Sequence, residues 1–119
     1  MATFPSSWRY PRVLAHRAGG TLAPENTLAG LREGLKHGYR AIEYDIMLAR
    51  DGVPVVLHDP YLGRTVAGSG NVVDYDAAEL ALLDAGGWFA RKHEGEPVPL
   101  FVEFAQFCKA HGVWMNMEI

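Results

Sequence analysis

Short apolar runs alternate with helical patterns along this chain, and that alternation limits the fold more than any other feature. Extended runs are predicted at residues 12–16, 39–48, 53–59 and 113–119, and helices at 27–37, 76–86 and 100–112. Strands that alternate with helices are typical of a parallel sheet with crossover connections. The predicted fold class is therefore α/β.

Local signals support these boundaries. Leu28, Leu31 and Leu35 recur at helical spacing, and Gly38 follows them as a natural helix terminator. The pair Asp51-Gly52 is typical of a tight turn that joins two strands in a hairpin. We therefore expect one well-defined helix followed by two extended segments joined by a short turn.

The pattern weakens between residues 60 and 97. A glycine-rich loop is followed by a short helix, for which Asp76 and Glu79 form a capping box. The remaining three main strands make an incomplete sheet with an open edge, and the last strand reaches Ile119 without a stop signal. We therefore expect the chain to be the first part of a longer α/β protein.

Composition narrows the class of protein. The chain has 119 residues, of which 49% are hydrophobic, and a net charge of -3, which suits one packed domain at most. The sequence has no basic patch of the kind that indicates nucleic acid binding. No apolar run approaches the ~18 residues of a membrane span, and no signal peptide is visible. Cys108 is the single cysteine, so we expect a buried structural thiol and a cytoplasmic protein.

Two acids interrupt the apolar run at residues 39–48. Side chains at i and i+2 of a strand share a face, so Glu43 and Asp45 project together, while Ile42, Tyr44 and Ile46 pack against a helix on the other face. Adjacent, partly desolvated carboxylates repel each other. A divalent cation such as Mg²⁺ or Ca²⁺ relieves this repulsion. Pairing with arginine and backbone donors, or exposure to solvent, remain alternatives.

A third acid lies near the end of the last predicted strand. Asn116 and Glu118 share a face there. If this strand runs parallel to residues 39–48, their carboxyl ends meet where α/β sheets place their sites. Glu118 then joins the acid pair around one cation. Alone, it would be read as a surface acid.

Two histidines end apolar segments. His16 closes the first extended run, and His58 closes the third. Imidazoles titrate near neutrality, so one can accept a proton while the other donates one. Asp59 follows His58 directly, and both an orienting role and an exposed loop position are open to it.

Arg17 follows His16 and precedes Gly19 and Gly20. Small residues let backbone N–H groups approach an anion, and a guanidinium matches phosphate geometry. Arg17 therefore reads as a phosphate ligand, with an ordinary surface arginine as the alternative. A cation, two histidines and an arginine suit hydrolysis of a phosphate ester. None of these residue types carries redox or carbonyl chemistry.

Five motifs follow one another from Val13 to Ile119. They are HRAGGTLAPENT, EYD, DGVPVVLHD, LGRTVAGSGNV and NMEI. With these motifs in this order, the sequence resembles the glycerophosphodiester phosphodiesterase family. The combination of His-Arg, Pro-Glu-Asn-Thr, Glu-x-Asp and His-Asp is highly specific, whereas each motif alone is weak.

The resemblance implies a TIM (β/α)8 barrel of the phospholipase C-like phosphodiesterase type. Residues 1–119 would be its N-terminal portion, with the first three main strands and a small insertion over about 60–97. It implies hydrolysis of glycerophosphodiesters to sn-glycerol 3-phosphate and an alcohol. By motif position it makes His16 and His58 the acid–base pair, Arg17 the phosphate contact, and Glu43, Asp45 and Glu118 the ligands of Mg²⁺ or Ca²⁺.

The sequence departs from the family pattern in several places. Ala18 stands where glycine is usual, so a loop that needs a positive φ there would be strained. The run VPLF replaces a Pro-Thr-Leu, which puts the N-cap of the following helix in doubt. The family's Asn-x-Glu-x-Lys motif ends here at Ile119, before the lysine.

Two other readings are weighed against glycerophosphodiester hydrolysis. One is a related phosphodiesterase that acts on lysophospholipids or inositol phospholipids. The other is a catalytically inactive binding module or fragment of the same fold, which would be indicated by loss of one histidine or one acid. Both histidines and all three acids are present. The partner expected is a small-molecule substrate, and a homo-oligomer is left open.

Overall fold

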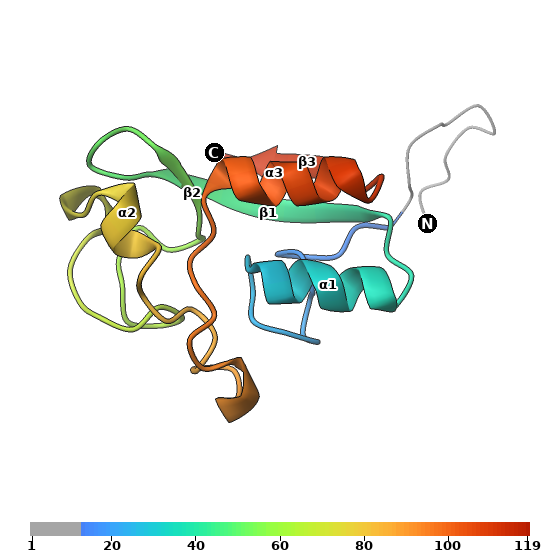
Figure 1. Cartoon of the computed structure of the whole chain (residues 1–119), viewed down its shortest axis with the longest axis horizontal. Helices are drawn as coiled ribbons and strands as arrows, with labels where there is room; N and C mark the ends of the chain where they lie inside the picture. Colours follow the sequence, from blue (N-terminus) through green and yellow to red (C-terminus); the bar gives the residue numbers. More distant parts are fainter. Residues whose placement is uncertain (1–12) are drawn as a thin grey trace, which may run out of the picture.

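The computed structural model describes residues 13–119 and contains a three-stranded sheet flanked by helices (Figure 1). The strands are β1 (Ala41–Leu48), β2 (Pro54–Val56) and β3 (Trp114–Glu118), in the order β2-β1-β3. The helices are α1 (Leu28–Lys36), α2 (Ala77–Leu80) and α3 (Phe101–Ala110), with 3-10 turns η1 (Val72–Asp74) and η2 (Arg91–His93). From α1 onward, the predicted element order is confirmed.

The sheet combines a hairpin with a parallel pair. β1 and β2 are antiparallel across the turn, where Gly52 has a φ of 78° that favours glycine. β1 and β3 are parallel, as predicted, and the register places Asp45 opposite Glu118. The carboxyl ends of β1 and β3 therefore lie at one edge of the sheet.

The strand predicted at residues 12–16 is wrong in its extent. Arg12 lies outside the described residues, and the rest contributes a single parallel bridge between Ala15 and Ile42. The amide of Ala15 donates to the carbonyl of Ala41, and the amide of Glu43 donates to the carbonyl of Ala15, both at 3.0 Å. The chain turns away directly after Ala15, so the run never lengthens into a ladder.

The helix predicted at 76–86 is also shorter than expected. α2 ends at Leu80, although its predicted capping box between Asp76 and Glu79 is present. Helix α1 matches its prediction more closely. Thr27 caps it by accepting a hydrogen bond from the amide of Gly30 at 3.0 Å, and Gly38 follows its end with a φ of 91°.

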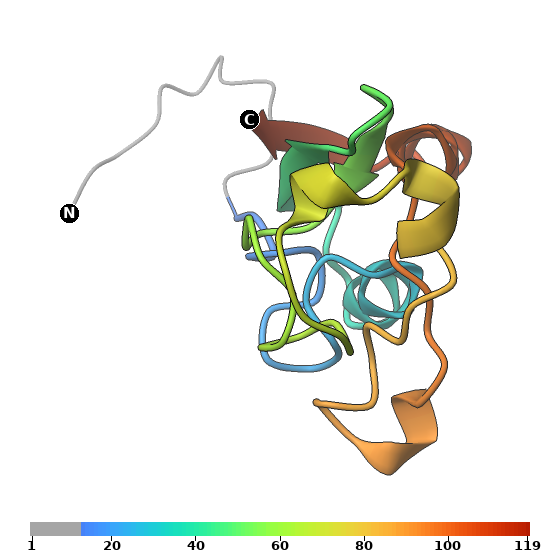
Figure 2. The ribbon, with the colours of Figure 1, turned by 90° about the vertical axis from the view of Figure 1, so that its left-hand side faces the viewer.

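The main core lies on the face of β1 that carries Ile42, Tyr44 and Ile46. Leu31 of α1 and Phe104 of α3 pack into the same cluster, and Figures 1 and 2 show both helices beside β1. The predicted division of β1 into an apolar face and an acidic face is confirmed, because Glu43 and Asp45 point the other way. Cys108 lies in this cluster, as predicted, and burial raises the pKa of its thiol to about 11.

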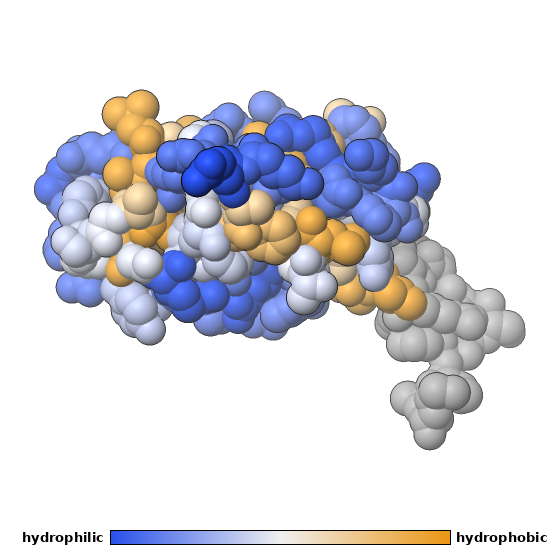
Figure 3. Space-filling model, turned by 90° about the horizontal axis from the view of Figure 1, so that it is seen from below, coloured by the Kyte–Doolittle hydropathy of each residue, from blue (hydrophilic) through white to orange (hydrophobic). Residues whose placement is uncertain are grey.

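A second apolar cluster holds the segment 60–97 against β2. Val55, Leu57, Leu62, Val66 and Leu80 contribute to it. In Figure 1 this segment, coloured from yellow-green to orange, extends away from the sheet. Figure 3 shows apolar surface among the hydrophilic atoms of the face seen from below. Within residues 13–119, no helix has the length and apolar character needed to cross a bilayer.

Candidate active site

Three carboxylates meet at the edge where β1 and β3 end. One oxygen from each of Glu43, Asp45 and Glu118 lies within 4.8 Å of the others. The parallel register explains this meeting, since Glu43 and Asp45 are two residues apart on β1 and Glu118 is the partner of Asp45 on β3. The sequence-predicted acidic cluster is thus brought together among the described residues.

Asp45 is held from the loop that precedes α1. Asp45 as a whole residue is 7% exposed. Its carboxylate accepts a hydrogen bond from the Asn26 side-chain amide at 2.9 Å. Asn26 in turn accepts from the Asp45 backbone amide at 3.3 Å, and it adopts a left-handed φ of 57°. Asn26 belongs to the motif HRAGGTLAPENT, but its local sequence predicts no role for it.

Arg17 contacts acids on β1 and in the loop before α1. Its backbone amide donates to Glu43 Oε1 at 3.1 Å, and its Nη1 donates to both oxygens of Glu25 at 3.1 and 3.0 Å. Its Nε is buried 3.9 Å from Asp45 Oδ2 and has no hydrogen-bond partner within residues 13–119. An unpaired buried donor is costly unless a ligand or water satisfies it.

The loop that carries Arg17 is pressed against helix α1 through glycines. A Cβ on Gly19 would lie 2.9 Å from the carbonyl oxygen of Gly30, and one on Gly34 would lie 2.8 Å from that of Ala18. Arg17 and Ala18 have φ values of 50° and 78°. The strain expected at Ala18 is therefore present, and the close contact with α1 holds it in place.

The two predicted histidines end their segments as expected. His16 is exposed beside Arg17 in the chain, and His58 follows Leu57, whose amide donates to the carbonyl of Asp45 at 3.0 Å. That backbone bond ties the His58 segment to β1, close in the chain to the acidic pair.

Asp59 orients His58. Its Oδ1 lies 2.7 Å from His58 Nδ1, and its side chain is only 8% exposed, so the alternative of an exposed loop acid is wrong. Arg64 donates to both oxygens of Asp59, at 2.8 and 3.2 Å. The hydrogen bond from Arg64 lowers the pKa of Asp59 against the opposing effect of burial. An ionised Asp59 makes Nδ1 the protonated nitrogen of a neutral His58, so Nε2 is then the unprotonated one.

Glu25 joins Arg17 to Arg64. Arg64 donates to its two oxygens at 3.1 and 2.8 Å, opposite the bonds from Arg17. Burial raises the pKa of Glu25, but the hydrogen bonds and charges of Arg64 and Arg17 outweigh it, and the net direction is downward. Neither Glu25 nor Arg64 was singled out from sequence, because a pairing across 39 residues leaves no local pattern.

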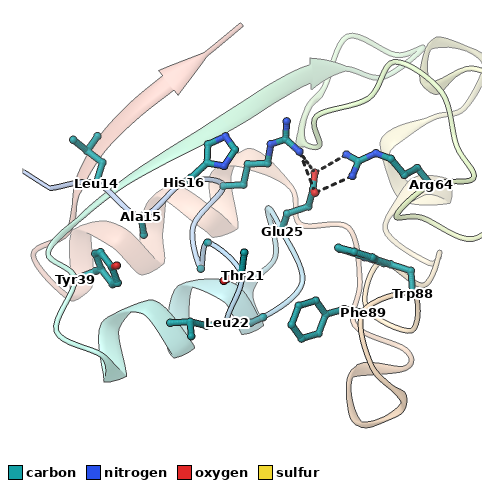
Figure 4. A pocket seen from close by; sticks show the side chains of 14 residues that line it. Leu14, Ala15, His16, Thr21, Leu22, Glu25, Tyr39, Arg64, Trp88 and Phe89 are labelled. Atoms are coloured by element: carbon teal, nitrogen blue, oxygen red, sulfur yellow. Dashed lines mark hydrogen bonds and ion pairs between the residues drawn. The ribbon is translucent and has the colours of Figure 1, made fainter.

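A cavity of about 770 Å³ opens next to this network (Figure 4). His16, Glu25 and Arg64 line one part of it, and Trp88 and Phe89 line another. The two aromatic rings come from the segment 60–97 and meet edge to face at 5.6 Å. The cavity thus has a charged wall and an apolar wall, and its lining includes His16 and Arg17 but not His58 or the three clustered acids.

The sequence of this chain matches one protein family. The family model described as "Glycerophosphoryl diester phosphodiesterase family" matches residues 16–119. The chain belongs to the glycerophosphoryl diester phosphodiesterase family. The matched region contains every predicted site residue: His16, Arg17, Glu43, Asp45, His58 and Glu118.

Relatives in this family are similar over most of the length of this chain. A glycerophosphodiester phosphodiesterase from Caldanaerobacter subterraneus subsp. tengcongensis is 37% identical over 107 residues, which is 90% of this chain and 44% of the relative. A mouse glycerophosphoinositol inositolphosphodiesterase is 41% identical over 90 residues, covering 69% of this chain and 17% of the relative.

A solved phosphodiesterase structure is also similar to this chain. An Oleispira antarctica phosphodiesterase in complex with the product sn-glycerol-3-phosphate superposes with a TM-score of 0.86 at 40% identity, covering 90% of this chain and 43% of that one. The chain therefore spans less than half the length of these family members, and its α/β fold is the corresponding part of their TIM barrel.

Proposed function

We propose that this protein hydrolyses glycerophosphodiesters to sn-glycerol 3-phosphate and an alcohol. The observation that carries the proposal is the meeting of three carboxylates within 4.8 Å beside the buried Nε of Arg17, which has no hydrogen-bond partner within residues 13–119. One feature suits a divalent cation and the other suits an anion, and a phosphodiester bound to a cation brings both to one place.

The acidic cluster fits Mg²⁺ or Ca²⁺. Both ions prefer oxygen ligands, and Glu43, Asp45 and Glu118 offer three carboxylates whose mutual repulsion a cation relieves. Asn26 and the Arg17 amide hold Asp45 and Glu43, so the cluster is oriented by hydrogen bonds around it. A bound divalent cation supplies charge neutralisation of phosphoryl oxygens and lowers the pKa of coordinated water or hydroxyl.

Arg17 would bind the phosphate. Glu25 holds its Nη1 and fixes the plane of the guanidinium, while its Nε has no hydrogen-bond acceptor among residues 13–119. A planar guanidinium with a free donor matches a phosphate oxygen in direction and in charge.

His58 and His16 would move the protons. The contact with ionised Asp59 keeps the proton on Nδ1 of His58 and leaves the Nε2 lone pair to accept one. His16 lies on the cavity wall at the end of the first segment, where it would act on the other side of the scissile bond. The assignment of base and acid between the two is open to either direction.

The substrate class follows from the relatives. The Oleispira enzyme was solved with sn-glycerol-3-phosphate, and the mouse relative is named for an inositolphosphodiesterase activity. A second candidate is therefore cleavage of glycerophosphoinositol on the inositol-phosphate side. A cytoplasmic location and a homo-oligomer stay predictions.

The test separates these candidates by their products. Purified protein is incubated with glycerophosphocholine, glycerophosphoinositol or a lysophospholipid, with Mg²⁺ or Ca²⁺ and then with EDTA. Release of glycerol 3-phosphate that EDTA abolishes supports the proposal. Release of inositol phosphate instead would assign the second candidate, and release of lysophosphatidic acid would assign a lysophospholipase D activity. Turnover that persists in EDTA would contradict the cation.

A further inference from the structure

Arg64 lies in the motif LGRTVAGSGNV. The proposed mechanism gives this motif no role. The Arg64 guanidinium makes four hydrogen bonds to two acids that are far apart in the chain. Nε and Nη2 donate to Asp59 at 2.8 and 3.2 Å, and Nη1 and Nη2 donate to Glu25 at 3.1 and 2.8 Å. Figure 4 shows Arg64 directed at Glu25.

The two acids each hold a different member of the proposed site. Asp59 contacts His58 at 2.7 Å, and Glu25 accepts two hydrogen bonds from Arg17. The groups therefore run His58, Asp59, Arg64, Glu25, Arg17, and the charges of the last four alternate. Arg64 is the central member of this series, and its side chain contacts both acids.

These contacts differ from an ordinary surface ion pair. Arg64 is 44% exposed, but its partners Asp59 and Glu25 are only 8% and 11% exposed. Exposed pairs contribute little to stability, whereas removing one partner leaves a largely buried charge uncompensated. A planar guanidinium can satisfy two carboxylates at once in fixed directions, which an ammonium cannot do.

The backbone around Arg64 is anchored as well. The amide of Gly63 donates to the carbonyl of Val66 at 2.9 Å, and that of Ala67 donates to the carbonyl of Asp84 at 2.8 Å. Thr65 and Val66 are buried directly after Arg64. The side chain therefore projects from a tight turn that is packed against the second apolar cluster.

We propose that Arg64 is a positioning residue for phosphodiester cleavage: it holds Asp59 against His58 and Glu25 against Arg17, so that one side chain sets both the acid–base imidazole and the phosphate-binding guanidinium. This inference rests on the proposed function for its chemistry. The arrangement of the five groups is independent of it.

Removal of Arg64 has two separate effects. The Asp59 carboxylate loses the partner that fixes its plane, and its negative charge is then shared with His58 alone, which favours the protonated imidazole. The charged groups that face His58 are Asp59 by direct contact and Arg64 behind it, with Glu25 beyond. Glu25 also loses its two hydrogen bonds from Arg64 and is less firmly placed against Arg17, so phosphate binding weakens.

The experiment compares Arg64→Gln, Arg64→Lys and the control Arg50→Gln. Arg50 is matched because it also bridges two acids, Asp76 and Glu79, each at 3.0 Å, but all three side chains are well exposed. The readouts are kcat and KM for a glycerophosphodiester over a range of pH, and the pH midpoint of His58 protonation measured by NMR.

For Arg64→Gln we expect kcat to fall about 10- to 100-fold, as when other partners that orient a functional imidazole are removed. We expect the His58 midpoint to rise by about half a pH unit, the size of one lost charge near the surface. Arg64→Lys keeps the charge, so its midpoint stays near that of the wild type, while kcat recovers only in part. Arg50→Gln changes neither.

The outcomes separate the inference from the proposed function. An active wild type with an unchanged midpoint and kcat in Arg64→Gln overturns the role of Arg64 and leaves the activity standing. A wild type without activity overturns the proposed function, and the NMR midpoint still decides whether Arg64 sets His58. If Arg64→Gln does not fold, full kcat in folded Arg64→Lys contradicts positioning by the guanidinium fork.

Discussion

Asp45 and Asp59 are both buried acids, but their side chains are held by different kinds of neighbour. Asn26 donates to Asp45, whereas Arg64 donates to Asp59. The amide of Asn26 is neutral and the Arg17 Nε lies 3.9 Å from Asp45, whereas the Arg64 guanidinium forms a close ion pair with Asp59 at 2.8 Å. At the scale of the residue, this difference suits one acid to a cation and the other to orienting an imidazole.

Asp45→Asn tests the cation at this scale. The change keeps the shape of the side chain and leaves an oxygen that can accept from Asn26, so the fold is retained. Affinity for Mg²⁺ or Ca²⁺, measured by calorimetry, should fall at least about tenfold because a charged ligand is lost. Glu103→Gln on α3, an exposed acid away from the cluster, serves as the control. Equal affinities in the two variants would exclude Asp45 as a ligand.

His58→Ala tests the proton transfer. We expect kcat to fall by about 10² to 10⁴, the usual size of a general acid–base contribution, with KM little changed. His111→Ala is the matched control, since His111 lies at the end of α3, and its ring stacks on Phe107 at 4.2 Å. Turnover of His58→Ala close to that of His111→Ala would remove His58 from the mechanism.

At the scale of the element, helix α1 positions the Arg17 loop through its glycines. Gly30 and Gly34 lie on the buried side of α1, and the backbone at Ala18 and Gly19 runs directly against them. Glycine costs helix stability relative to alanine. The close approach of the loop explains why α1 carries glycine at these positions, and it links the helix to the geometry of Arg17.

Gly34→Ala should therefore destabilise the protein although alanine favours helix. The new Cβ would lie 2.8 Å from the carbonyl oxygen of Ala18, so the loop must shift. We expect the free energy of unfolding, measured by denaturant titration, to fall by about 1–3 kcal/mol, as for other overpacked sites. Lys36→Ala on the exposed side of α1 is the control. A gain in stability for Gly34→Ala would show that the loop gives way without cost.

At the scale of the whole molecule, the site draws on segments that are far apart in sequence. The loop before α1, the ends of β1 and β3, and the turn at Arg64 each supply charged groups. Folding must therefore bring many charges together, and the stability of the molecule depends on how those charges are neutralised.

Acid should weaken the fold for this reason. The pKa values of Asp59 and Glu25 lie below their ordinary 3.8 and 4.5, so the unfolded chain takes up protons at a higher pH than the folded one. The stability from these acids is present above the ordinary values and is lost as pH falls through the lower folded values. Denaturant titrations from pH 7 to pH 3 should show this loss. Asp59→Asn should reduce it, and an identical profile in that variant would contradict the assignment.

Much of this architecture is readable from the sequence because it depends on local patterns. Leucine spacing and a glycine terminator mark α1, alternation separates the two faces of β1, and Asp51-Gly52 marks the hairpin. The acid pair on β1 also follows from strand geometry alone. The run at 12–16 and the helix at 76–86 were predicted too long, because pairing and packing, not propensity, decide where such short segments end.

The sequence by itself determined which residue types could carry the chemistry and on which elements they stand. Only the tertiary structure decided that Asn26 holds Asp45, that Asp59 is enclosed, and that Arg64 joins Glu25 to Asp59. The physical reason is that an ion pair between distant segments depends on where the backbone brings them, and no periodicity along the chain records that distance. Charge, spacing and local propensity are local properties, whereas burial and neutralisation belong to the assembled fold.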